Sequence, residues 1–108
     1  MITFKKRERT DEIRMSFCPE YAGMETQKII NTVKRKGKLN LGYHYILRET
    51  GVIEKGIDFE LYADYELEGY KQSIYVMVLS EELTDAQSHA LDVLADKLSL
   101  KVNSPERV

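Results

Sequence analysis

The fold of this chain is decided by residues 41–56, which read LGYHYILRETGVIEKG. Residues 43–48 are mostly aromatic or apolar and contain no proline, so we expect a strand over residues 42–48. Gly51 lies in the charged stretch that follows, where a tight turn needs a residue with positive φ. Residues 52–55 then predict a short return strand. The whole stretch indicates a β-hairpin.

A second strand signal lies at residues 73–79, where apolar residues are nearly continuous. Its two faces would carry Ile74, Val76 and Val78 on one side, and Tyr75, Met77 and Leu79 on the other. A strand that is apolar on both faces is covered on both sides. We therefore expect residues 73–79 to lie in the centre of a sheet.

One more strand and two helices complete the expected fold. Residues 12–18 alternate apolar and polar side chains over most of their length, as a half-buried strand does. Residues 24–36 carry one apolar face at helical spacing, and residues 84–99 open with a capping box and continue with a second apolar stripe. Both stripes must be buried, and the strand at 73–79 offers two sides. The sequence therefore predicts an α/β fold with a mixed central β-sheet flanked by helices.

The chain has two histidines, and neither has a set of metal ligands around it in the sequence. We expect His44 to be a partly buried strand residue with a hydrogen-bond partner, because a lone histidine is no metal site. His89 lies off the apolar stripe of its helix, so we expect it to be exposed.

Length and composition indicate one domain over residues 1–108, and residues 1–11 of this domain form a basic N-terminal arm. No run of 18 apolar residues is present, so no membrane span is expected. Charge from Lys5 onward argues against a signal peptide. Cys18 is the single cysteine and has no partner for an internal disulfide, which fits a reducing cytoplasm.

Charge is distributed unevenly along the chain. Residues 1–50 hold 11 Lys and Arg against 6 Asp and Glu, a net of +5, whereas residues 51–108 hold 5 against 12, a net of −7. Such polarity suits a protein partner with complementary charge, although charged residues also simply solvate a surface.

The arm carries four basic residues, Lys5, Lys6, Arg7 and Arg9. It is either a mobile, solubilising terminus or a contact for an acidic protein surface. Direct binding to nucleic acid is disfavoured, because the arm is short and aromatic residues do not alternate with its charges.

Four motifs, taken together, resemble a known family. They are the Gly42-Tyr43-His44-Tyr45 hairpin with its return strand, residues 4–13, residues 73–79 and residues 83–87. In this order they resemble the zinc-dependent type 2 N-acetylmuramoyl-L-alanine amidases, a peptidoglycan-recognition-protein-like family, and within it the small amidases of short-tailed T-seven-type phages. The resemblance runs from about residue 4 to about residue 100. It implies the amidase fold.

The resemblance also implies that the active site has kept some of its residues and lost its zinc ligands. Tyr43 corresponds to the family's active-site tyrosine, and His44 and Glu54 are kept with it as vestigial catalytic candidates. The first zinc-binding histidine corresponds to Ser16, whose hydroxyl is not a usual zinc ligand. The second corresponds to Glu66, or to Asp64 or Tyr65 with a one-residue gap. The segment with the third ligand is missing, so we expect a degenerate, C-terminally truncated domain without zinc or another cofactor.

By the same resemblance we expect no catalysis and instead a protein-binding role. The phage amidases also bind and inhibit their own RNA polymerase, and their N-terminal arm contributes to this. A catalytically inactive relative that keeps the arm would be an inhibitor or regulator of a polymerase or of a bacterial defence protein, in the cytoplasm of a bacterial host. Two alternatives stay open: a zinc-dependent amidase, and a peptidoglycan-binding module in phage lysis. Peptidoglycan is the less favoured partner, because the sequence shows no signal or wall-binding repeat.

Overall fold

The structure is a computed structural model, and it describes residues 9–103. Three residues of the basic arm, Lys5, Lys6 and Arg7, lie outside this range. The described elements are, in chain order, β1 (Glu12–Phe17), the short 3₁₀ helix η1 (Pro19–Tyr21), α1 (Thr26–Arg35), β2 (Tyr45–Leu47), β3 (Ile53–Lys55), β4 (Ser73–Val78), α2 (Asp85–Leu98) and β5 (Lys101–Asn103).

The strands form one mixed sheet in the order β3-β2-β4-β1-β5. β4 pairs in parallel with β1 on one side and with β2 on the other. β5 adds to β1 in parallel, and only the β2–β3 hairpin is antiparallel. All six residues of β4 are buried. The expected mixed sheet with the strand near 73–79 at its centre is confirmed.

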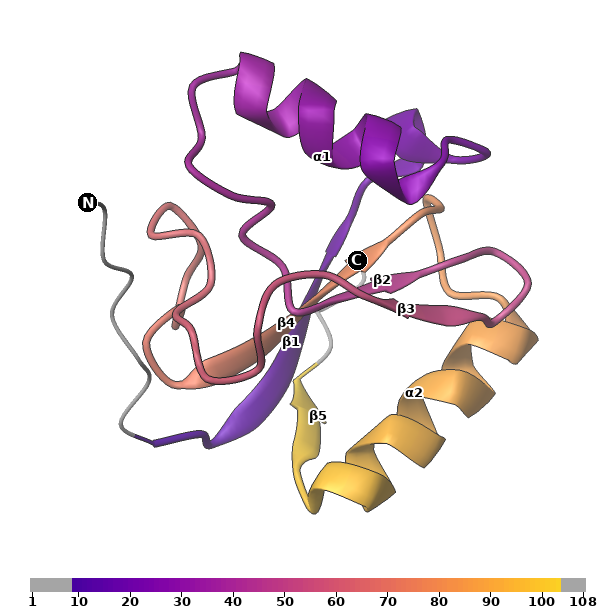
Figure 1. Cartoon of the computed structure of the whole chain (residues 1–108). Coiled ribbons are helices and arrows are strands. Elements are labelled where there is room, and N and C mark those ends of the chain that lie inside the picture. The colour runs from indigo at the N-terminus through magenta and orange to yellow at the C-terminus, as the bar shows by residue number, and fades with distance from the viewer. Residues whose placement is uncertain (1–8, 104–108) are drawn as a thin grey trace.

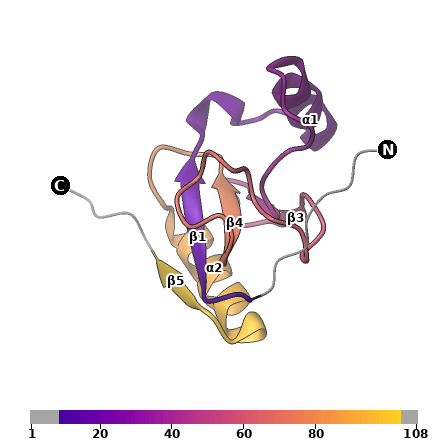
Figure 2. The same cartoon turned by 90° about the vertical axis from the view of Figure 1, so that its left-hand side faces the viewer.

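The two helices cover opposite faces of this sheet (Figures 1 and 2). The core on the α2 side contains Ile13, Met15, Leu47, Ile74, Val76, Val78, Leu91 and Leu94. The core on the α1 side contains Tyr21, Ile29, Val33, Leu41, Ile46, Ile57, Met77 and Leu79. β4 supplies side chains to both cores, as its two apolar faces predict. At about 25 cal/mol per Å² of buried apolar surface, these two layers are the main stabilising term of the fold.

The helix ends follow the sequence signals. Thr84 accepts a hydrogen bond from the backbone N–H of Gln87 (3.1 Å), and the Gln87 side chain accepts one from the backbone N–H of Thr84 (2.9 Å), so the expected capping box is present. Lys34 and Arg35 lie in the last turn of α1, where positive charge complements the helix dipole. Gln87 is fully buried, and its amide also donates to the carbonyl oxygen of Arg48. It thereby ties α2 to the hairpin.

Strand boundaries are narrower than the sequence suggests, and one strand was not predicted. The expected strand over 42–48 is only Tyr45–Leu47, because Gly42 has φ +80° and interrupts the extended backbone before it. β5 was not predicted at all, because it has one apolar residue, Val102, and exists only through its pairing with β1. Within residues 9–103, no helix has both the length and the apolar character needed to cross a membrane.

Candidate functional site

Two of the residues that the resemblance assigns to the active-site position, Ser16 and Tyr43, come together with Cys18 near the end of β1. Ser16 lies near the end of this strand, opposite Met77 of β4. Cys18 follows β1, and its backbone N–H donates to the carbonyl oxygen of Val78 (2.7 Å). Tyr43 approaches from the segment before β2 and lies close enough to Ser16 and Cys18 for both side chains to influence its pKa. We call these three residues the Ser16 cluster.

Tyr43 is held in place by its backbone and by its ring. Its carbonyl oxygen accepts a hydrogen bond from the backbone N–H of Ile57 (2.9 Å). A Cβ atom on Gly56 would lie only 2.1 Å from that same oxygen, so the chain can pass there only as glycine. The Tyr43 ring stands edge-on to Tyr75 with 6.0 Å between centroids, a favourable aromatic geometry. The hairpin therefore fixes the direction of the Tyr43 side chain.

The Ser16 cluster is uncharged at neutral pH. Burial is the largest influence on Tyr43 and raises its pKa, while the nearby Ser16 hydroxyl lowers it. Burial also raises the pKa of the Cys18 thiol to about 11, and the charge of Glu20 adds to this. A protonated thiol is neither a nucleophile nor a metal ligand. The cluster offers hydroxyl and thiol groups for hydrogen bonding and little else.

The acidic loop after β3 contains the positions expected to replace the second zinc ligand, and Lys38 pairs with two of them, Asp64 and Glu66. Asp64 is close enough to Tyr43 for its charge to raise the pKa of the tyrosine. Glu66 is 60% exposed, and its Oε1 atom lies 2.5 Å from Nζ of Lys38. Lys38 also pairs with Asp64 at 3.2 Å. Both carboxylates are thus engaged by one lysine.

These residues do not fit a zinc ion. The side chain at the first ligand position, Ser16, is engaged with Tyr43. Among residues 9–103, no three His, Cys, Asp or Glu side chains come together in a way that would hold a metal. A catalytic zinc site needs three protein ligands and one open position, and no such set is formed here.

His44 is buried and serves the fold. It is 1% exposed, so the expectation of partial burial was wrong, and it immediately precedes β2 instead of lying inside the strand. Its Nδ1 atom accepts a hydrogen bond from the backbone N–H of Tyr75 (3.0 Å). Its Nε2 atom lies 2.7 Å from the carbonyl oxygen of Leu61 and donates to it, since Nδ1 is the acceptor. With both ring nitrogens used, His44 provides no base for the Ser16 cluster.

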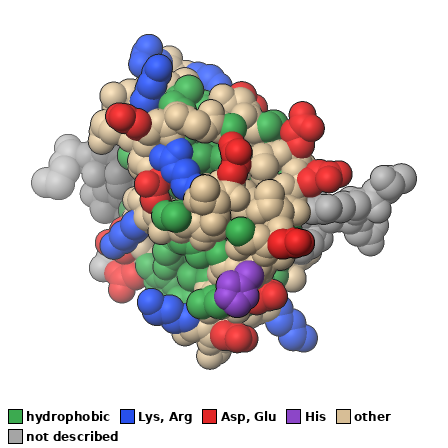
Figure 3. Space-filling view, turned by 90° about the vertical axis from the view of Figure 1, so that its right-hand side faces the viewer, with side chains coloured by type: hydrophobic (Ala, Val, Ile, Leu, Met, Phe, Trp, Pro, Cys, Tyr) green, Lys and Arg blue, Asp and Glu red, His purple; other side chains and the backbone are tan. Residues whose placement is uncertain are grey.

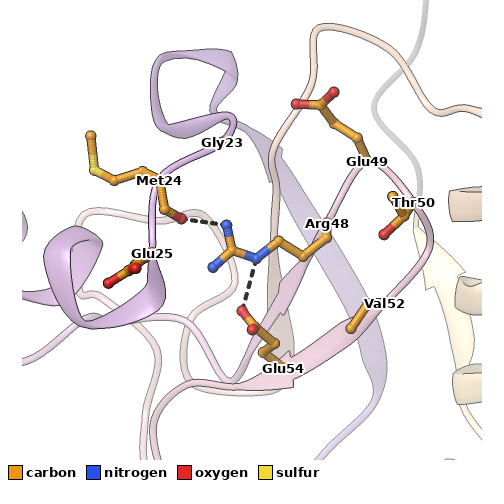
Figure 4. A pocket seen from close by; sticks show the side chains of 8 residues that line it. All are labelled: Gly23, Met24, Glu25, Arg48, Glu49, Thr50, Val52 and Glu54. Atoms are coloured by element: carbon orange, nitrogen blue, oxygen red, sulfur yellow. Dashed lines mark hydrogen bonds and ion pairs between the residues drawn. The ribbon is translucent and has the colours of Figure 1, made fainter.

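Glu54 belongs to a different group of residues, centred on Arg48 (Figure 4). The Arg48 Nε donates to Oε2 of Glu54 (2.9 Å), and its Nη2 donates to Oγ1 of Thr26 (2.8 Å). Its Nη1 donates to the carbonyl oxygen of Met24, and Thr26 donates to Glu54. The hydrogen bond from Thr26, followed by Arg48, lowers the pKa of Glu54. Glu54 therefore anchors the hairpin to the start of α1.

This second group borders a pocket of about 420 Å³ that sequence reasoning missed. It is lined by Gly23, Met24, Glu25, Arg48, Glu49, Thr50, Val52 and Glu54. One sequence feature of the hairpin could have indicated one side of this pocket. Positions 48 and 54 lie diagonally across it on one face, where opposite charges attract. No sequence pattern near residues 23–26, however, indicated that they would form the opposite wall of the pocket.

The remaining candidates lie at the surface. Arg9 is exposed and pairs with Asp11 at 2.8 Å, whereas Lys5, Lys6 and Arg7 are beyond the described part of the chain. His89 is exposed, as expected, and is the purple side chain in Figure 3. Figure 3 also shows acidic and basic side chains interspersed over this face, with hydrophobic ones gathered beside the histidine.

The layered sheet and its strand order define a fold, and it is the fold of the N-acetylmuramoyl-L-alanine amidases and the peptidoglycan recognition proteins (PGRPs). The N-acetylmuramoyl-L-alanine amidase LysC from Clostridium intestinale superimposes with a TM-score of 0.73 at 18% identity, over 95% of this chain and 78% of that one. PGRP-Hd from Alvinella pompejana superimposes with a TM-score of 0.74 at 18% identity, over 95% and 77%. Bumblebee PGRP-SA gives 0.75 at 11% identity, over 94% and 74%.

No protein-family model and no curated protein matches the sequence. At identities this low, the likeness establishes the fold. The resemblance first indicated by the hairpin at residues 41–56 is thereby confirmed at the level of the fold. Activity and partners are a separate question.

Proposed function

We propose that this chain is a catalytically inactive protein with the amidase fold, and that it acts by binding another protein as an inhibitor or regulator. The observation that carries the proposal is the Ser16 cluster. At the place where the family would hold zinc, this chain has a serine, a cysteine and a tyrosine as neighbours, and burial keeps the thiol and the phenol protonated. The fold is maintained around them by two full apolar cores. Without zinc ligands, the maintained fold would still present a surface to which another protein can bind.

The resemblance to the phage amidases supports a polymerase or a bacterial defence protein as the target, in the cytoplasm of a bacterial host. The contact would include the arm residues Lys5, Lys6, Arg7 and Arg9. Opposite charge on the partner would accelerate association.

The catalytic half of this proposal is tested by metal analysis and a peptidoglycan assay. We expect the purified protein to bind no stoichiometric zinc and to release no peptide from peptidoglycan, with LysC from Clostridium intestinale as the active comparison. A complete structural zinc site is worth about 10–16 kcal/mol in small peptides, and most of this is lost without its ligands. Stoichiometric zinc together with peptide release would overturn the proposal in favour of an amidase.

A second candidate function is binding of peptidoglycan fragments without cleavage. Two observations favour it: the fold, and the hydroxyl groups that Tyr43 and Ser16 place at the active-site position. One structure with this fold is a PGRP-LCa and PGRP-LCx ectodomain complex bound to tracheal cytotoxin. The test is co-sedimentation with insoluble peptidoglycan, using Tyr43→Ala as the loss variant. Retention of the wild type but not of Tyr43→Ala would support this candidate over the first.

A further inference from the structure

The pocket beside Arg48 shares no lining residue with the Ser16 cluster, and Glu54 is the one vestigial catalytic candidate that lines it. One wall is the turn before α1, with Gly23, Met24 and Glu25, and the other is the hairpin turn, with Glu49 and Thr50 (Figure 4). Arg48 crosses between the two walls. We propose that this pocket receives an arginine side chain from a protein partner. This inference rests on the proposed protein-binding function and names the chemistry of the partner.

Arg48 itself does not make the pocket a site for anions. Each of its three guanidinium nitrogens already donates a hydrogen bond, to Glu54, Thr26 and the carbonyl oxygen of Met24. Its charge is compensated by Glu54 at 2.9 Å. What Arg48 still presents is the flat face of the guanidinium group, on which another planar group can stack.

The remaining charge of the pocket is negative. Glu25 and Glu49 are exposed, and in the part of the chain that the structure describes neither carboxylate makes a hydrogen bond or an ion pair. With Arg48 and Glu54 compensating each other, the lining carries a net charge of about −2 at neutral pH. An incoming cation would therefore be attracted.

The apolar part of the lining selects the shape of that cation. Met24 is partly buried, and Val52 is 55% exposed. Within residues 9–103, Val52 is one of five large apolar residues that are exposed to solvent. An arginine covers such surface with its aliphatic stem while its planar head pairs with carboxylates in a two-pronged geometry. A purely apolar ligand would leave the two carboxylates without a partner, and a small anion would be repelled by them.

The probe is a capped pentapeptide, Gly-Leu-Arg-Leu-Gly, and the readout is amide chemical shifts of the ¹⁵N-labelled full chain. We expect saturable shifts at Met24, Glu25, Glu49, Thr50 and Val52, which weaken as salt is added. The same peptide with citrulline, a neutral isostere of arginine, should bind at least about threefold more weakly. Spermidine serves as the free polyamine. Tighter binding of spermidine than of the arginine peptide would overturn the assignment to a protein side chain.

The matched variants carry the same change in net charge. Glu25→Gln with Glu49→Gln should weaken the peptide roughly threefold to tenfold, as expected for two exposed ion pairs. The control is Asp92→Asn with Asp96→Asn, two exposed positions on α2, which should leave the affinity unchanged. Equal weakening by both pairs would reduce the effect to overall charge and overturn the proposal. Shifts at the pocket that depend on protein concentration alone would assign it to a second copy of this chain and also overturn it.

Failure here is distinguishable from failure of the proposed function. If the pocket variant binds a captured partner as tightly as wild type while variants of the basic arm do not, protein binding stands and the pocket proposal fails. If the peptide binds as predicted but the wild type retains no protein partner, the pocket stands as a site for arginine and the protein-binding function fails.

Discussion

At the scale of residues, His44 contributes to stability through the backbone groups that its imidazole ring joins. Its imidazole bridges the backbone of β4 and the loop at Leu61 from a position that is 1% exposed. His44→Ala would leave a buried N–H and a carbonyl oxygen unpaired and open a cavity. We expect a loss of about 2–4 kcal/mol in the free energy of unfolding, measured by urea denaturation.

The matched control is the other histidine. His89→Ala removes an exposed side chain, so the free energy of unfolding should change by no more than about 0.5 kcal/mol. Equal effects of the two substitutions would contradict the structural role given to His44.

Gly56 is the second residue on which the site depends. A methyl group there would have to displace the Tyr43 carbonyl oxygen at 2.1 Å and the Leu41 side chain at 2.9 Å. Gly56→Ala should therefore cost about 2 kcal/mol or more in thermal or urea unfolding. Gly37→Ala is the comparison, because its surroundings are open and only its φ of +96° is unfavourable, at about 1 kcal/mol. A cost for Gly56→Ala no larger than that of Gly37→Ala would show that the hairpin shifts easily.

At the scale of elements, the Arg48 group couples the β2–β3 hairpin to α1, and this coupling depends on pH. The pKa of Glu54 is lowered in the folded state, chiefly by the hydrogen bond from Thr26 and then by Arg48. A lowered pKa means that the carboxylate contributes stability above its unfolded value of about 4.5, and that the contribution is lost as pH falls through the folded pKa.

We therefore expect Glu54→Gln to be less stable than wild type at pH 7 by less than about 1 kcal/mol, because the pair is partly exposed. The difference should shrink below about pH 4.5, as measured by urea unfolding across the pH range. Glu81→Gln, at an exposed position, should show no such convergence. A difference between wild type and Glu54→Gln that stays constant down to pH 3 would count against the role of the charge.

Secondary-structure elements were predicted correctly where neighbouring residues carry a recognisable pattern. Elements and contacts that depend on residues far apart in the sequence were not predicted. β4 was identified as central because both of its faces are apolar, and the α2 capping box because its two residues are three apart. β5 has no such pattern and forms only because β1 offers it a parallel partner. The contact between Tyr43 and Ser16 was implied by resemblance. The contact of Arg48 with Thr26 joins residues 22 positions apart, and no local signal announces it.

At the scale of the whole molecule, the predicted partner contact is electrostatic. Replacing Lys5, Lys6, Arg7 and Arg9 with Gln should leave the free energy of unfolding within about 0.5 kcal/mol of wild type. Association with a captured partner should become slower at low salt, and the difference should fade as salt shortens the screening length to about 8 Å or less. Stopped-flow association rates across a salt series measure this.

The control keeps the total charge the same. Lys28, Lys34, Arg35 and Lys97 are exposed basic residues on the two helices, and their replacement with Gln removes the same four charges elsewhere. Equal slowing by both quadruple variants would mean that net charge, and not the arm, guides the encounter.

The strand order carries a consequence for synthesis of the protein on the ribosome. Residues 12–17 pair with residues 73–78 in the centre of the sheet and with residues 101–103 at its edge, so β1 depends on partners that are synthesised much later. Parallel pairings of this kind have high contact order and form slowly. Until β4 and β5 have been translated, β1 has no strand partner and its apolar side chains are exposed. The nascent chain is prone to aggregation in this state. The hairpin at residues 45–55, whose partners are neighbours in the chain, is the part of the sheet able to form during translation.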